Sequence, residues 1–125
     1  ILASIVLVSL SNARNKATVA AYKSTMSSLI PAVTLCCDNS TNALQTTAGS
    51  DVCNPALSVN LPTATQMKAT GVTYAVNTLC NTANPSLTVT PSGLPITGCN
   101  AATYVSSTGI FSNAGLTTAG YPSGC

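Results

Sequence analysis

The N-terminal 33 residues constrain the fold of this chain more than any other stretch. Residues 1–10 read ILASIVLVSL, an apolar run interrupted only by serine, and no Gly or Pro occurs before Pro31. Apolar residues then continue at helical spacing through an amphipathic segment. We expect one continuous helix from Ile1 to about Ile30. It should end or kink there, because a residue that precedes proline is restricted from helical geometry.

Two separate faces run along this expected helix, at about 100° per residue. One face carries large side chains suited to covering a sheet: Val19, Tyr22, Met26, Leu29, Ile30 and Val33. The opposite face carries mostly small residues, which let another helix backbone approach closely: Leu10, Ala13, Ala17, Ala20, Ala21, Ser24 and Ser28. A surface helix of a monomer needs only one apolar face. The second face indicates either a core helix buried on both sides or packing against copies of itself.

The apolar run at residues 1–10 is too short to span a bilayer, which takes about 20 apolar residues. It also lacks the basic region and the small-residue cleavage site of a complete signal peptide. The run fits the end of a longer apolar helix, which would hold an unassembled subunit in a membrane.

Residues 1–17, ILASIVLVSLSNARNKA, resemble the second half of the N-terminal segment of type IV pilins and pseudopilins. The shared features are the Ile-Leu-Ala-Ser-Ile sequence, a following Leu, and a polar step with Asn, Ala and Arg, where the family's helix leaves the membrane. The family's leader Gly, mature N-terminal aromatic residue and following Glu are absent. We therefore expect either a truncated chain or a first part that is not included. Cleavage, methylation and Glu-mediated registration cannot be placed on any residue here.

The resemblance implies a type IV pilin-like α+β fold, with a long N-terminal helix packed on a small antiparallel sheet and disulfide-stapled loops. Residues 1–33 would be the membrane anchor before assembly and the filament core afterwards, and residues 34–125 the globular head. The implied function is a structural subunit, not an enzyme, of an extracellular filament on a bacterial cell surface. The residues expected to pack in that filament are Ile1, Leu2, Ile5, Val6, Leu10, Ala13, Ala17, Ala20 and Ala21.

The resemblance also implies a set of partners. These are copies of the chain itself, the inner membrane before assembly, a prepilin peptidase, and assembly motor and platform proteins.

Two other functions stay open. A pseudopilin or minor pilin of a type II secretion or competence system would use the same fold, and a secreted or anchored binding domain would use the helix only as an anchor. Only 5% of residues are charged, against about 25% in a typical soluble protein. The resulting weak self-repulsion favours the long filament.

The chain has six cysteines, and this number in 125 residues indicates an oxidising compartment. The even count allows complete pairing among Cys36, Cys37, Cys53, Cys80, Cys99 and Cys125. We expect a Cys80–Cys99 bridge, with Cys36 and Cys37 taking Cys53 and Cys125 in either order. A zinc site is the weaker alternative, because the chain has no CxxC pair and no histidine.

The second half of the chain predicts an antiparallel meander. Apolar and polar residues alternate over 72–76 and 87–89, and a third strand is expected over 101–107. Turns are expected at Asn84-Pro85 and at Pro91-Ser92-Gly93. One face of this sheet should cover the large-residue face of the helix, which gives a two-layer α+β domain.

The remaining segments predict little regular structure. Residues 31–61 should form an irregular connection with one short strand at Leu57–Leu61, and Thr63–Ala69 a short helix between Pro62 and Gly71. Residues 109–125 are rich in Gly and should form a loop that is held at its end by Cys125.

No catalytic constellation is visible, and we expect no cofactor or metal. Histidine is absent, and the only carboxylates, Asp38 and Asp51, lie in turn-rich sequence. They could hold a cation with Asn39 or Ser40, but turn formation is the favoured role. The Lys and Arg residues number 4, too few for a strong phosphate-binding surface, so nucleic acid is not an expected partner.

One candidate modification site stands out in the irregular connection. Asn39-Ser40-Thr41 is an N-glycosylation sequon on what should be a surface loop. The alternative is a chance match, because the chain is rich in Asn and Thr.

Overall fold

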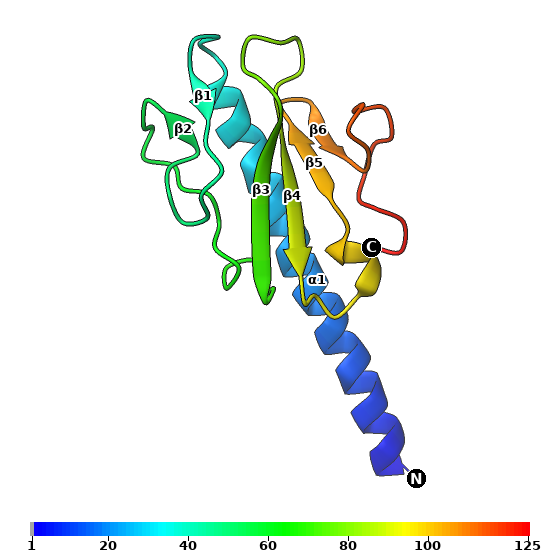
Figure 1. Cartoon of the computed structure of the whole chain (residues 1–125). Helices are drawn as coiled ribbons and strands as arrows, with labels where there is room; N and C mark the ends of the chain where they lie inside the picture. Colours follow the sequence, from blue (N-terminus) through cyan, green and yellow to red (C-terminus); the bar gives the residue numbers. More distant parts are fainter. Residues whose placement is uncertain (1) are drawn as a thin grey trace.

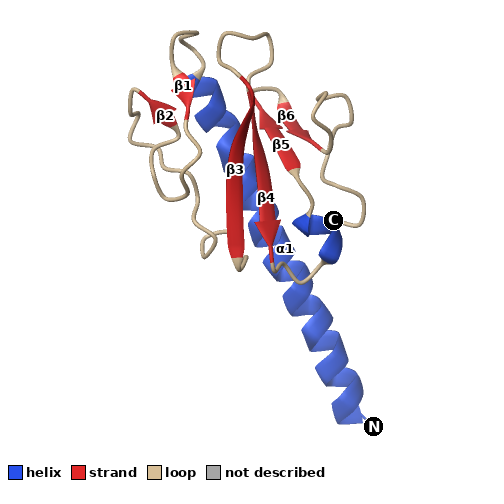
Figure 2. Cartoon of the chain, viewed as in Figure 1, coloured by secondary structure: helices blue, strands red, loops and turns tan. Residues whose placement is uncertain are grey.

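The structure, a computed structural model, describes the backbone of residues 2–125 and the side chains of residues 4–125. A single long helix, α1 (Leu2–Cys36), lies across one face of an antiparallel sheet and continues well beyond it (Figure 1). Figure 2 shows the two layers, with the sheet and its loops gathered on the C-terminal half of the helix. The prediction of an α+β fold with a helix packed on antiparallel strands is confirmed.

Helix α1 does not end at about Ile30, and that prediction is wrong. Pro31 lies inside the helix, which continues to Cys36. An internal proline costs about 3 kcal/mol, because it removes one backbone hydrogen bond and crowds the preceding turn. Burial of Ala32, Val33 and Cys36 after the proline offsets this cost, since each is at most 4% exposed. The disulfide of Cys36 also holds the last turn in place.

The main sheet is a meander of four strands in the order β3-β4-β5-β6. The strands are β3 (Gly71–Thr78), β4 (Ser86–Ser92), β5 (Thr103–Ser106) and β6 (Gly109–Phe111), and all neighbours are antiparallel. Two details differ from the sequence prediction. Pro91 belongs to β4 rather than to a turn, because β5 pairs with β4 only as far as Val89 and leaves no partner for the missing N–H. Strand β6 lies in a segment that was expected to be a loop.

The connection between α1 and β3 holds a small second sheet of β1 (Ala43–Leu44) and β2 (Cys53–Asn54). The strand expected at Leu57–Leu61 is absent from this described segment, where only Asn60 forms an isolated bridge with Asp51. The expected helix at Thr63–Ala69 is also wrong, because the segment makes turns only. Positive φ angles at Ser58 (61°) and Lys68 (59°) interrupt regular structure in both places.

The core lies between α1 and the inner face of the sheet. The large-residue face of α1 points into it as predicted: Val19, Tyr22, Met26, Leu29 and Val33 are buried, and Ile30 is partly buried. Leu87 and Val89 of β4 and Val105 of β5 complete the layer from the other side. From the irregular connection, Leu61 and Met67 are also fully buried, so this segment covers one end of the core.

All six cysteines form disulfides: Cys36–Cys53, Cys37–Cys80 and Cys99–Cys125. The expected Cys80–Cys99 bridge is wrong. Cys80 follows β3, whereas Cys99 lies in the 3₁₀ turn η1 (Thr97–Asn100) that follows β4. In a meander, consecutive connections lie at opposite ends of the sheet, and Figure 1 shows the two connections so placed. Cys36 pairs with Cys53, which is one of the two partners that were expected for it. The expectation that Cys37 pairs with Cys53 or Cys125 is wrong, because Cys37 pairs with Cys80 and Cys125 with Cys99.

Candidate self-assembly surface

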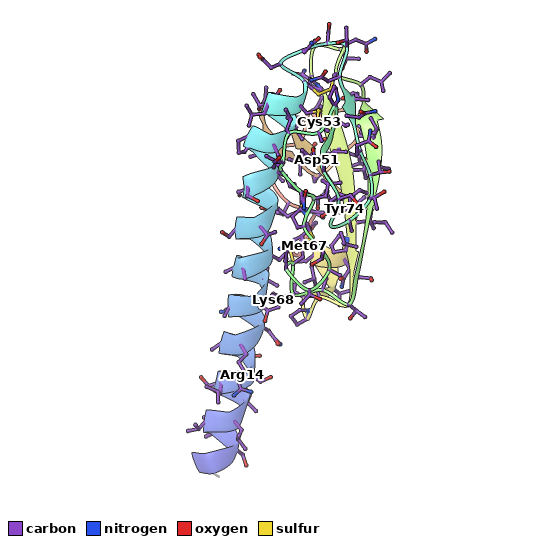
Figure 3. The ribbon with its side chains drawn as sticks, turned by 90° about the vertical axis from the view of Figure 1, so that its left-hand side faces the viewer. Arg14, Asp51, Cys53, Met67, Lys68 and Tyr74 are labelled. Carbon is purple, nitrogen blue, oxygen red and sulfur yellow. A yellow bond between two sulfur atoms is a disulfide. The ribbon has the colours of Figure 1, made fainter. Side chains whose placement is uncertain are left out.

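The N-terminal part of α1 projects from the head and exposes large apolar side chains. Ile5, Val6, Leu7 and Val8 are between 61% and 66% exposed, and Leu10 is 48% exposed. Consecutive residues of a helix point in directions about 100° apart, so these side chains lie around the whole helix. Figure 3 shows this half of α1 standing clear of the head, with Arg14 on the projecting part.

The small-residue face of α1 is also open. Ala13, Ala17 and Ala20 are exposed, and Ala21 is partly buried beside the head. Ser24 and Ser28 continue the exposed face along the side of α1 that faces away from the sheet. A core helix buried on both sides is therefore ruled out. Among the residues expected to pack in a filament, Ile1 and the side chain of Leu2 lie outside what the structure describes.

The projecting part of α1 carries positive charge only. Arg14 and Lys16 are exposed, and no acidic residue occurs in α1. A shallow hollow beside them is lined by residues of α1 alone: Ser4, Ile5, Val8, Ser9, Asn12, Ala13 and Lys16. The hollow is mostly apolar and carries no group suited to acid–base chemistry near its one lysine. This lining is suited to contact with another apolar surface.

Lys23 does not belong to this surface. Its Nζ atom donates a hydrogen bond to the backbone carbonyl oxygen of Cys125 at 2.7 Å and lies 4.9 Å from the ring centroid of Tyr121. This contact could not be predicted from the sequence, because both partners are about a hundred residues away from Lys23 and share no motif with it. Lys23 therefore anchors the C-terminal segment to the helix.

Asp51 stabilises a turn-rich loop, which is the role that the sequence favoured over cation binding. Its carboxylate accepts hydrogen bonds from the backbone N–H groups of Cys53 at 3.0 Å, Leu57 at 3.0 and 3.1 Å, and Ser58 at 2.7 Å. These bonds, led by that from Leu57, lower the pKa of the Asp51 carboxyl. Both carboxylate oxygens are used to close the loop, so Asp51 is poorly suited to hold a cation.

The described chain contains one cluster of metal-ligand residue types, formed by Cys36, Cys37 and Cys80. All three sulfur atoms are committed to disulfides. A disulfide sulfur lacks the thiolate that zinc requires. The cluster therefore cannot hold zinc in this oxidised state.

Within residues 2–125, no helix combines the length and the apolar character that a bilayer crossing requires. No protein-family model, curated protein sequence or solved structure matches this chain. The features that bear on function are therefore the open surface of α1, the disulfide-stapled head and the resemblance carried by residues 1–17.

Proposed function

We propose that this chain is a structural subunit that polymerises through α1 into a type IV pilus-like filament on the cell surface. The observation that carries the proposal is the exposed apolar surface of the projecting helix. Four consecutive large apolar side chains, Ile5 to Val8, are more than 60% exposed. Full burial of one such side chain is worth about 1.5–3 kcal/mol. A helix that leaves all of them in water gains much by packing with other apolar helices.

The small residues on α1 determine which face of the helix can pack closely against another helix. Ala13, Ala17 and Ala20 lie on one face, where their size lets a neighbouring backbone come close. The large residues of the same helix, such as Tyr22 and Met26, are already used by the head. Apolar side chains lie all around the projecting part of α1, so one copy can present different faces to different neighbours, which makes the contacts heterologous. A heterologous contact whose rotation does not close into a ring produces a helical filament.

The head supports the same proposal. Three disulfides tie its loops together, and two of them are attached to the end of α1. A head stapled in this way would stay folded while the helix moves from the inner membrane into a filament. The chain has only 6 charged residues, from 4 basic and 2 acidic ones, so identical heads can lie side by side with little repulsion. By the resemblance, a prepilin peptidase and assembly motor and platform proteins would act on the subunit before and during assembly.

Electron microscopy of the sheared surface fraction, labelled with an antibody against the head, tests this function. The full chain should be found in long, uniformly labelled filaments. Protein that stays in the membrane without filaments would contradict the proposal. It would shift the interpretation to a pseudopilin or to an anchored binding domain.

Ala17→Glu tests the packing face itself. Ala17 is exposed on the helix, so a glutamate there leaves the core of the head intact but places a charge between packed helices. Filaments should be lost while all six cysteines remain paired in the membrane-bound subunit. Ala17→Ser is the matched control, because it keeps the small size and should assemble normally. Normal filament yield from Ala17→Glu would overturn the packing face.

A further inference from the structure

The turn that follows α1 holds its asparagine side chain in one defined orientation. The Oδ1 atom of Asn39 accepts a hydrogen bond from the backbone N–H of Thr41 at 3.0 Å and one from the Thr41 hydroxyl at 2.8 Å. Asn39, Ser40 and Thr41 are all exposed. A backbone N–H can only donate, so the Asn39 atom that faces it must be the carbonyl oxygen. The Nδ2 atom of Asn39 therefore points away from Thr41.

Other asparagines of the head use their Nδ2 atoms to hold the structure together. Nδ2 donates to a backbone carbonyl or a hydroxyl oxygen in Asn42, Asn77, Asn100 and Asn113. Among the described asparagines whose side chains form hydrogen bonds, Asn39 alone makes none from Nδ2. Its amide nitrogen is presented to solvent on a turn that is already ordered.

We propose that Asn39 is an N-glycosylation site, which accepts an oligosaccharide from a polyisoprenyl diphosphate donor. In this transfer Nδ2 forms a bond to C1 of the first sugar, and the bond from C1 to the phosphate oxygen breaks. The diphosphate leaves with the electron pair, and the Nδ2 proton passes to a carboxylate base of the transferase. The reaction needs a hydroxyl at the third position of the sequon, which Thr41 supplies. An oxidising compartment, as the three disulfides indicate, is compatible with such a transferase.

The location of Asn39 separates this modification from assembly. Figure 1 shows the end of α1 and the turn after it at the opposite end of the molecule from the projecting N-terminal half. Cys37, two residues before Asn39, is tied to Cys80, which keeps the turn at the outer end of the head. A glycan on Asn39 would extend away from the exposed helix surface. The inference therefore does not rest on the proposed filament.

Peptide mass spectrometry of the protein isolated from its own cells tests the site. The peptide that contains Asn39 should carry a glycan mass in the wild type. The glycan should be lost in Asn39→Gln, and also in Thr41→Val, which keeps the shape and the backbone N–H but removes the hydroxyl. Ser40→Ala is the matched control, because it alters the turn but keeps the sequon, and it should stay glycosylated.

Several outcomes would overturn the site. An unmodified Asn39 in the wild-type protein would do so, and so would a glycan that persists in Thr41→Val. A glycan mass that remains in Asn39→Gln would report attachment to a hydroxyl instead and would also reject the proposal. Filament formation is measured separately on the same cells and should not change in Asn39→Gln. A failure of glycosylation is thus distinguishable from a failure of assembly.

Discussion

The hydroxyl of Tyr121 donates a hydrogen bond of 3.0 Å to the backbone carbonyl oxygen of Lys23. The Lys23 ammonium group in turn lies 4.9 Å from the centroid of the Tyr121 ring and donates to the carbonyl oxygen of Cys125. Cys125 is bonded to Cys99. The C-terminal segment is thus attached both to the middle of α1 and to the turn after β4. Neither attachment involves a strand.

Two substitutions separate the parts of the Tyr121 contact. Tyr121→Phe removes the hydrogen bond but keeps the ring over the ammonium group, and should lower the free energy of unfolding by about 1 kcal/mol. Tyr121→Ala should cost more, because it also removes the cation–π contact, worth about 0.5–1 kcal/mol, and the ring packed near Tyr22. Urea unfolding of the full chain, followed by circular dichroism, measures both. Equal losses in the two variants would show that the ring contributes nothing.

Asp51 should make the stability of the 51–58 loop depend on pH. Hydrogen bonds from backbone N–H groups, first that of Leu57, lower the pKa of this carboxyl below its ordinary value. The ordinary pKa is about 3.9. The folded state therefore binds the proton more weakly than the unfolded state. The stabilisation is fully present above about pH 4 and is lost as the pH falls through the lowered value.

Asp51→Asn tests this dependence. The variant should be less stable than the wild type at pH 7, and the difference should shrink as the pH is lowered below about 4. Amide hydrogen exchange at Leu57 and Ser58 should become faster in the variant at neutral pH. Asp38→Asn is the control, because Asp38 is an exposed carboxylate on the turn after α1 and should leave both measurements unchanged. A pH-independent difference between Asp51→Asn and the wild type would contradict the role of the carboxylate charge.

The two disulfides at the end of α1 are close enough to exchange. The sulfur atoms of Cys36, Cys37 and Cys80 all lie within 4.8 Å of one another. In Cys53→Ala, Cys36 keeps a thiol beside the Cys37–Cys80 bond. Its thiolate can attack the Cys80 sulfur, which forms Cys36–Cys80 and releases Cys37 as the thiolate. No net oxidation or reduction is involved.

Alkylation followed by peptide mapping should detect this exchange. At pH 8 the Cys53→Ala protein should contain two populations, one with Cys36 alkylated and one with Cys37 alkylated. Cys125→Ala is the control, because the thiol left on Cys99 lies at the other end of the sheet and should be the only one alkylated. Alkylation of Cys36 alone in Cys53→Ala would show that the three sulfurs do not exchange.

Local periodicity was enough to predict the large-residue face of α1. Val19, Tyr22 and Met26 recur at helical spacing, and all three are buried against the sheet. Alternation likewise located β3 and β4. The end of α1 could not be predicted, since the effect of Pro31 is local whereas the burial of Val33 that outweighs it is tertiary. The strand β6 was missed because a run of three residues has no measurable period.

Contacts between distant segments could not be predicted either, because they too depend on the tertiary structure. The pairing of Cys80 with Cys37 rather than Cys99 depends on which end of the sheet each connection occupies. The contact of Lys23 with Tyr121 depends on the path of the last loop. The Asn39 sequon was visible in an expected surface loop, but the direction of its amide nitrogen follows only from the bonds that Thr41 donates. Helical spacing predicted a second face on α1 but left open whether it is buried or exposed; the structure shows Ala13, Ala17 and Ala20 exposed.

Tyr22 and Tyr74 are both buried, but their hydroxyl groups differ in hydrogen bonding. The Tyr74 hydroxyl donates a hydrogen bond of 2.7 Å to the carbonyl oxygen of Pro62 and lies 3.8 Å from the Met67 sulfur; Figure 3 shows Tyr74 and Met67 on neighbouring parts of the head. The Tyr22 hydroxyl is buried without a hydrogen-bond partner in the described part of the chain. Burial raises the pKa of Tyr22 to about 12.

Removal of each hydroxyl should therefore have a different effect. Tyr74→Phe should lower the free energy of unfolding by about 1–3 kcal/mol, because it leaves the Pro62 carbonyl unpaired. Tyr22→Phe should leave stability at pH 7 unchanged or raise it, since no bond is lost and a buried polar group is removed.

The stabilities of the wild type and of Tyr22→Phe should also differ at alkaline pH. The pKa of Tyr22 is about 10 in the unfolded chain and about 12 in the folded state. Between these two pH values the unfolded state has released its proton and the folded state has not. The wild type therefore loses stability over this interval. Tyr22→Phe should lose less over the same interval. Urea unfolding of both variants at pH 7 and pH 11 measures the two effects together. If Tyr22→Phe is destabilised as much as Tyr74→Phe at pH 7, the Tyr22 hydroxyl must have a partner in solution.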